Sequence, residues 1–108
     1  METQVVETQQ EIHLDETLRA LVINGKAINL GPREYQIFSV LWQRKETVLS
    51  RQQILDLVDS QIKIFDRSID SVISHIRKKL RRFQPCSLQI LGVYGKGYKL
   101  TWRQNNHI

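Results

Sequence analysis

The 108 residues are 41% apolar and 25% charged, which is typical of one soluble globular domain and too short for two. A single cysteine, Cys86, excludes an internal disulfide and a cysteine-rich zinc site, and no apolar run reaches the ~18 residues that a transmembrane helix needs. The net charge of +5 is unevenly spread: residues 66–103 carry nine Lys and Arg against two acids, whereas residues 1–65 carry seven against nine. The last third therefore has the charge expected of a nucleic-acid-binding face.

The first 30 residues predict a small antiparallel β-meander. Residues 1–10 are polar and expected to be a loose N-terminal segment, and residues 11–14 alternate polar and apolar side chains. Residues 18–23 are predicted to form a strand, and Asn24-Gly25 is a strong hairpin signal because both residues tolerate a positive φ. Residues 26–30 return as the next strand. Since the N-terminus has no signal-peptide pattern, we expect a cytoplasmic protein made of a single domain, residues 1–108.

Two helices are predicted next. Gly31-Pro32-Arg33-Glu34 begins the first, because proline at the N1 position wastes no donor and a glutamate in the first turn suits the helix dipole. Its apolar face continues to about Lys45. Residues 50–53, Ser-Arg-Gln-Gln, match the capping box S-x-x-Q and predict a second helix that ends near Asp59. Residues 60–65 are expected to form a loop with more apolar side chains than solvation would select.

The third predicted helix, residues 66–83, has one apolar side and one basic side. It is expected to begin at Asp66 or Ser68, both competent N-cap residues. Its apolar residues recur at the i, i+3, i+4, i+7 spacing of one helix face: Ile69, Val72, Ile73, Ile76, Leu80 and Phe83. The opposite side offers Arg67, Ser71, Ser74 and Lys78, flanked by His75, Arg81 and Arg82. The alternative is an ordinary solvated basic face.

The chain closes with a predicted β-hairpin. Residues 88–93 are expected to be extended, Tyr94-Gly95-Lys96-Gly97 to turn, and residues 98–102 to return. Packing across the hairpin is favoured for Tyr94 and Tyr98, with base stacking as the alternative. A hairpin after three helices is a wing, so the sequence predicts an α+β fold: a winged helix-turn-helix with an N-terminal antiparallel β-meander, three helices and a C-terminal β-hairpin wing.

Six blocks of residues resemble, in order and spacing, the OmpR/PhoB-type winged-helix DNA-binding domain of response regulators. They are Asn24-Gly25, residues 30–35, 49–55, 66–70, 76–80 and 95–100. The resemblance covers about residues 12–102. It implies the effector domain of a two-component response regulator, with the third helix in the major groove of double-stranded DNA and the wing at the minor groove. It also implies head-to-tail dimers on DNA and a contact with RNA polymerase through the 59–65 loop.

Carried onto this sequence, the resemblance implies that Arg67 contacts phosphate, that Arg77 lies in the recognition helix and that Lys96 is at the wing tip. Ser71, Ser74 and His75 take the places that face base edges. The family often has His where this chain has Val72, basic residues where it has Ser74 and His75, and Arg where it has Tyr94. These departures imply a target sequence of its own.

The chemistry of the side chains supports the same surface. The small Ser71 and Ser74 would let the helix approach the bases, and Lys78 and His75 suit the acceptors of guanine. The other cations suit phosphates, although Arg77 and Lys79 border the apolar stripe, where the alternative is packing over the core, and cations in the last turn also favour the helix dipole. The predicted DNA-binding residues are Arg67, Ser68, Ser71, Ser74, His75, Arg77, Lys78, Lys79, Arg81, Arg82, Tyr94 and Lys96.

No catalytic arrangement is evident in the sequence. His13, His75 and His107 lack metal-ligand spacing, Gly95-Lys96-Gly97 is too short for a phosphate loop, and no receiver pattern is present. We therefore expect that the protein is not an enzyme, needs no cofactor and makes no membrane contact through this segment. We expect it to be a sequence-specific DNA-binding regulator. The alternatives are a winged-helix protein-docking module and the cytoplasmic part of a ToxR-like membrane-anchored regulator.

Overall fold

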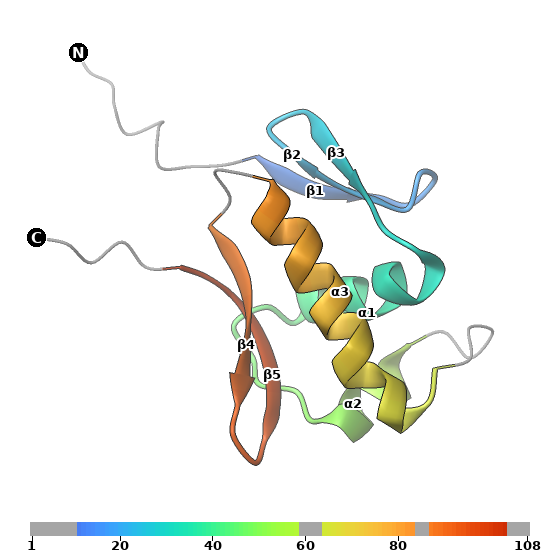
Figure 1. The fold of residues 1–108 in the computed structure, drawn as a ribbon, viewed down its shortest axis with the longest axis vertical. Coiled ribbons are helices and arrows are strands. Elements are labelled where there is room, and N and C mark those ends of the chain that lie inside the picture. Colours follow the sequence, from blue (N-terminus) through green and yellow to red (C-terminus); the bar gives the residue numbers. More distant parts are fainter. Residues whose placement is uncertain (1–10, 59–63, 84–86, 104–108) are drawn as a thin grey trace, which may run out of the picture.

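The computed structural model describes residues 11–58, 64–83 and 87–103. The predicted loose segment 1–10, Cys86 and most of the 59–65 loop lie outside these residues. Along the chain the elements are β1 (Ile12–Asp15), β2 (Ala20–Ile23), β3 (Lys26–Asn29), α1 (Pro32–Gln43), α2 (Arg51–Leu57), a 3-10 turn (Asp66–Ser68), α3 (Ile69–Arg82), β4 (Leu88–Val93) and β5 (Gly97–Trp102) (Figure 1). The predicted α+β winged helix-turn-helix is confirmed.

The N-terminal meander is an antiparallel sheet in the order β1-β2-β3. Its hairpin turn has positive φ at both Asn24 (51°) and Gly25 (83°), as the Asn-Gly signal predicts. The prediction that the second strand begins at residue 18 is wrong, because β2 begins at Ala20. Arg19 adopts a positive φ of 50°, and the N–H of Leu18 donates to Asp15 Oδ1 at 3.0 Å. Residues 16–19 therefore form a turn that leaves Leu18 exposed.

Local hydrogen bonds start the first two helices where the sequence predicts them. Pro32 is the first residue of α1, and Glu34 Oε1 accepts from the Gly31 N–H at 3.0 Å. At α2, Ser50 Oγ accepts from the Gln53 N–H at 3.1 Å, and Gln53 Oε1 accepts from the Ser50 N–H at 2.8 Å, which completes the predicted capping box. Both helices end about two residues earlier than predicted, at Gln43 and Leu57.

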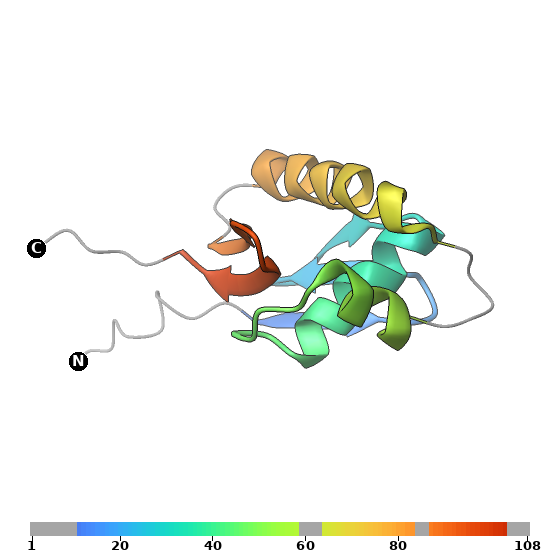
Figure 2. The ribbon, with the colours of Figure 1, turned by 90° about the horizontal axis from the view of Figure 1, so that it is seen from below.

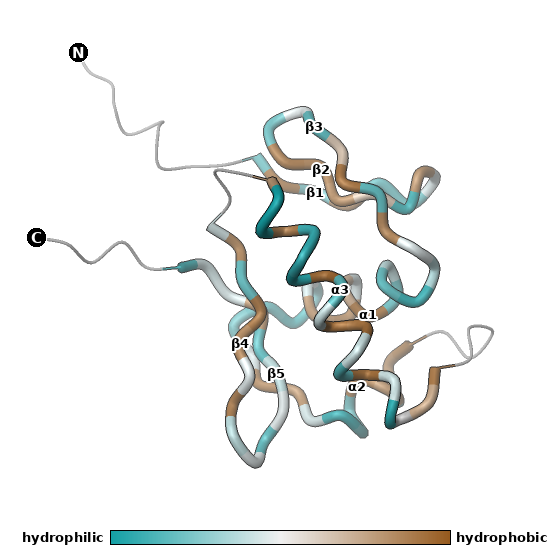
Figure 3. Tube along the Cα trace, in the orientation of Figure 1, coloured by the Kyte–Doolittle hydropathy of each residue, from teal (hydrophilic) through white to brown (hydrophobic). Residues whose placement is uncertain are grey.

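The predicted apolar face of α3 lies in the core. Ile69, Ile73 and Ile76 are completely buried, and they belong to one cluster with apolar residues of the meander, α1, α2 and the hairpin. Figure 2 shows α3 along one side of the domain, with α1 crossing toward the opposite side. Apolar and polar positions alternate along the α3 trace, as expected of a helix with one side in the core and the other side pointing outward (Figure 3). No helix in the described part of the chain is long and apolar enough to cross a membrane.

The wing is joined to the α1–α2 connection by a close backbone contact. β4 and β5 pair antiparallel from Leu88 opposite Trp102 to Val93 opposite Gly97. The N–H of Leu49 donates to the Tyr98 carbonyl at 2.8 Å, and the N–H of Tyr98 donates to the Leu49 carbonyl at 2.9 Å. A Cβ at Gly97 would lie 1.9 Å from the Leu49 carbonyl oxygen, and Gly97 has a φ of 144°. Glycine at this position is therefore what lets the wing meet the helical core.

Candidate nucleic-acid interface

The side of α3 that points away from the core carries polar and basic side chains. We call this set the outward stripe: Arg67, Ser71, Ser74, Lys78 and Arg82, all of them exposed. His75 borders it and is also exposed. Among the described residues, Lys78 and Arg82 have no hydrogen-bond or ion-pair partner. The stripe thus combines slender polar groups with cations that are available to an outside ligand.

Arg77 faces the wing instead of the outward stripe. Its Nε and Nη2 donate to the Ile90 carbonyl at 3.0 and 2.8 Å, and its guanidinium carbon lies 5.6 Å from the ring centroid of Tyr98. The side chain is half-buried. The structure therefore uses Arg77 to join α3 to β4, which corresponds to the alternative that its position at the edge of the apolar stripe suggested.

Lys79 lies on the other flank of α3, against α1 and the meander. Its Nζ pairs with Glu34 Oε1 at 2.6 Å and donates to the Asn29 carbonyl at 2.9 Å. Burial of the Glu34 carboxyl by itself raises its pKa, but the hydrogen bonds from Lys79 and the Gly31 N–H outweigh it, so the pKa is lowered. Lys79 is thus engaged within the protein and is not part of the outward stripe.

Asp70, the single acid within α3, is held between α2 and the wing. Arg51 Nε and Nη2 both donate to Asp70 Oδ1, at 3.1 and 2.8 Å, and Nη2 also lies 3.0 Å from Oδ2. The Tyr98 hydroxyl donates to Asp70 Oδ1 as well. The Tyr98 hydrogen bond, followed by that of Arg51, lowers the pKa of Asp70. Sequence reasoning missed Arg51 and Tyr98 as the two partners of Asp70. The signal that could have indicated such partners was a lone carboxylate in a basic helix.

The first turn before α3 places Arg67 and Ser68 next to Phe65. The Arg67 guanidinium carbon lies 5.6 Å from the ring centroid of Phe65, which is 57% exposed. Ser68 is the residue before the helix, as predicted, but its side chain makes no cap bond; its N–H donates to the Phe65 carbonyl at 2.8 Å. Its helical φ and ψ of −89° and −12° explain this, because a side-chain cap needs an extended residue.

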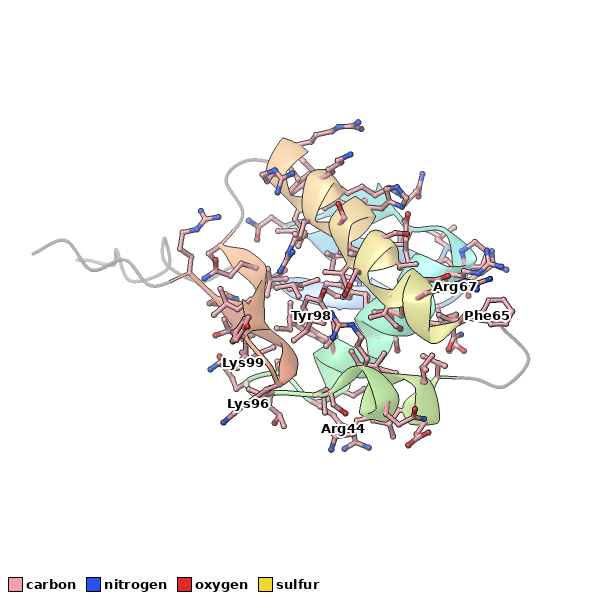
Figure 4. All side chains as sticks on the ribbon, turned by 60° about the horizontal axis from the view of Figure 1, so that its bottom comes forward. Arg44, Phe65, Arg67, Lys96, Tyr98 and Lys99 are labelled. Carbon is pink, nitrogen blue, oxygen red and sulfur yellow. The ribbon has the colours of Figure 1, made fainter. Side chains whose placement is uncertain are left out.

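The tip of the wing presents Tyr94 and Lys96 to solvent. Tyr98 lies opposite Gly92 in the hairpin and is buried in the core, whereas the predicted packing across the hairpin is wrong for Tyr94, which is fully exposed. The last strand pair is Val93 with Gly97, so Tyr94 lies in the turn and has no residue opposite it. Figure 4 shows Tyr98 between the hairpin and α3, with Lys96 on the outer side of the hairpin. Arg81 is also exposed, near the C-terminal end of α3.

The described residues contain no group of three or more His, Cys, Asp and Glu side chains that could hold a metal ion.

A three-helix core, a terminal hairpin and a helix with a free basic face define a winged-helix domain. The chain belongs to the family described as "Transcriptional regulatory protein, C terminal", whose match covers residues 25–100. This membership confirms the predicted resemblance to the OmpR/PhoB-type domain.

Individual proteins similar to this chain support the family assignment. The transcriptional regulatory protein BaeR of Escherichia coli is 32% identical over 99 residues, which is 91% of this chain and 41% of that protein. The CpxR homolog of Haemophilus influenzae is 36% identical over 81 residues, 72% of this chain and 35% of that protein. Among solved structures, the response regulator AdeR DNA-binding domain in complex with an intercistronic region has a TM-score of 0.69 and 26% identity, covering 85% of this chain and 95% of that one. The chain thus spans about two fifths of the length of BaeR and of the CpxR homolog.

Proposed function

We propose that this domain binds double-stranded DNA in a sequence-specific manner and so regulates transcription, as the effector domain of a two-component response regulator. The observation that carries the proposal is the outward stripe of α3. There Lys78 and Arg82 have no hydrogen-bond or ion-pair partner among the described residues, while the flanking Arg77 and Lys79 are engaged in the fold. The solved AdeR domain, which this chain resembles, was determined with DNA, and this supports the same class of ligand.

In this proposal α3 enters the major groove and the wing lies at the adjacent minor groove. Ser71 and Ser74 are exposed and small, so the helix backbone can approach the base edges closely. Lys78 and His75 are then the side chains that reach guanine acceptors. Cations at the ends of the surface, Arg67, Arg81, Arg82 and Lys96, are placed for phosphates, which fix register without reading sequence.

We assign Arg77 and Lys79 to supporting roles in this interface. Their donors already bind the Ile90 and Asn29 carbonyls and the Glu34 carboxylate. Moving Arg77 to a phosphate would leave the partly buried Ile90 carbonyl without these donors, which costs about 1–3 kcal/mol, and moving Lys79 would break its ion pair with Glu34. We further propose that the whole chain, residues 1–108, acts as one domain in the cytoplasm and performs no catalysis.

A second function, docking of another protein, is favoured by one specific observation. Leu57 is 40% exposed and Phe65 is 57% exposed, and they lie on the two sides of the 59–63 segment in the chain. Ile64, by contrast, packs partly against the core. We propose that Leu57 and Phe65 contact RNA polymerase, and that the domain binds direct repeats as a head-to-tail dimer. Loss of transcription with unchanged DNA affinity in Leu57→Ala would support the polymerase contact.

The DNA-binding proposal is tested with a duplex recovered from a random library by repeated selection. Gel-shift titrations at two salt concentrations compare Lys78→Ala and Arg67→Ala with the wild type. We expect both to bind more weakly, Arg67→Ala about equally on all sequences and Lys78→Ala most on the selected one. Arg44→Ala is the matched control, because Arg44 lies at the C-terminal end of α1, across the domain from α3 (Figures 2 and 4).

Two outcomes of these measurements would contradict the DNA-binding proposal. If the wild type recovers no preferred duplex, sequence-specific binding is wrong. If Lys78→Ala and Arg67→Ala bind as tightly as Arg44→Ala, the outward stripe is not the DNA-binding surface. In either case circular dichroism must show that the variants are folded, which the exposure of all three side chains leads us to expect.

A further inference from the structure

The base of the wing contains a polar cluster that the proposed DNA contacts leave without a role. It consists of Arg51, Asp70, Arg77 and Tyr98, and we call it the Tyr98 cluster. Tyr98 is only 8% exposed, and the guanidinium carbons of Arg51 and Arg77 lie 5.7 and 5.6 Å from its ring centroid. Its hydroxyl donates to Asp70. One tyrosine on the wing is thus held by three charged side chains of the helical core.

The cluster ties the hairpin to both helices beneath it. Arg51 is the first residue of α2 and grips the carboxylate of Asp70 in α3. Arg77 of α3 donates to the Ile90 carbonyl of β4. Tyr98 of β5 closes the set through its hydroxyl. Hydrogen bonds with an ionised partner are directional, so they fix a distance and an angle that apolar packing alone leaves adjustable.

We infer that Tyr98 is a positioning residue for DNA binding: through Asp70, its hydroxyl holds the wing at a set place relative to α3. Lys96 at the wing tip and the outward stripe then meet the duplex as one preorganised surface. A surface that is already ordered binds without the entropic cost of arranging its two parts. This inference rests on the proposed DNA-binding function and names the side chain that couples its two contact elements.

Tyr98→Phe isolates the hydroxyl, because it keeps the ring that packs in the core and contacts both guanidinium groups. The readout is a double-mutant cycle with Lys96→Ala on the selected duplex. In the wild type we expect Lys96→Ala to weaken binding about fivefold, which is at the upper end of what an exposed ion pair contributes. In the Tyr98→Phe background the same substitution should change affinity by less than about twofold, because the hydrogen bond that aligns the wing with Asp70 of α3 is lost.

A footprint adds a positional readout. Hydroxyl-radical cleavage of the selected duplex reports minor-groove protection, and protection lost in Lys96→Ala marks the wing. We expect Tyr98→Phe to lose that same protection and to keep the rest. The matched control is Tyr35→Phe, the same chemical change on α1 instead of on the wing. It should retain the full effect of Lys96→Ala and the complete footprint.

The outcomes separate this inference from the function on which it rests. An equal loss on Lys96→Ala in both backgrounds would overturn the positioning role and leave DNA binding intact. No loss on Lys96→Ala in the wild type would overturn the wing contact together with this inference, whereas a wild type that prefers no duplex would overturn the proposed function itself. If Tyr98→Phe does not fold, Asp70→Asn takes its place in the same cycle, since it removes the charged acceptor of the hydroxyl.

Discussion

The flanks of α3 and its outward stripe carry the same kinds of cation but use them differently. On the flanks, Arg77 donates to the Ile90 carbonyl and Lys79 pairs with Glu34. On the outward stripe, Lys78 has no such partner among the described residues. Each step along a helix turns the side chain by about 100°, so three consecutive cations face three different surroundings. The number of basic residues in a recognition helix therefore overstates the charge that it offers to a ligand.

Displacing the wing from the helical core should have the largest effect on stability. Gly97→Ala should lower the free energy of unfolding by about 3 kcal/mol or more, because its Cβ would meet the Leu49 carbonyl at 1.9 Å and the backbone must move. Urea denaturation measures the loss. Gly95→Ala is the control: its φ is 75° but nothing lies within 4 Å, so it should cost about 1–2 kcal/mol. Equal losses would contradict the close contact.

Neighbouring substitutions on α3 should then separate stability from binding. Arg77→Ala leaves the Ile90 carbonyl without its donors and should cost about 1–3 kcal/mol of folding free energy. Lys78→Ala should change stability by less than about 0.5 kcal/mol but weaken binding to the selected duplex by about 1–3 kcal/mol. Denaturation without DNA and gel shifts with DNA give the two quantities. A destabilised Lys78→Ala with unaltered DNA affinity would reverse the assignment.

The salt dependence of DNA binding should distinguish the outward stripe from the flanks of α3 by a smaller effect. If the four cations proposed for phosphates engage them, log K should fall with log salt at a slope of roughly −3 to −4. Arg67→Ala should make this slope shallower by about 1, whereas Lys79→Ala should leave it unchanged because Lys79 is paired with Glu34. Fluorescence anisotropy over a range of KCl concentrations measures the slope. A change of about 1 in Lys79→Ala would place that side chain on DNA.

Acid should weaken both flanks, with the smallest effect of the four. The pKa of Asp70 is lowered by the Tyr98 hydrogen bond and then by Arg51, and the pKa of Glu34 is lowered because its hydrogen bonds outweigh its burial. A carboxyl whose folded pKa is lowered stabilises the fold above its unfolded value and loses that contribution as pH falls through the folded value. We expect unfolding free energy to drop below about pH 4. Asp70→Asn should flatten this drop in an acid titration, and an unchanged profile would contradict the linkage.

Much of the fold was predictable because its signals are local. The period of Ile69, Ile73 and Ile76 predicted the buried face of α3, and Ser50 with Gln53 predicted the start of α2. The start of β2 was mispredicted, because the apolar Leu18 favoured a strand while the turn depends on the Asp15 side chain and on the positive φ of Arg19. Propensity alone does not show which of two local conformations such a hydrogen bond selects.

The sequence alone determined the elements, their caps and the angular order of side chains around α3, since these depend on residues a few positions apart. Only the tertiary structure decided which cations remain available to a ligand. The partners that engage the other cations are distant in the chain. Lys79 meets Glu34 45 positions away, Tyr98 meets Asp70 28 positions away, and Arg51 meets Asp70 19 positions away. Helical periodicity places a charge on a side of the helix, whereas the packing of α1, α2 and the wing determines what that charge meets.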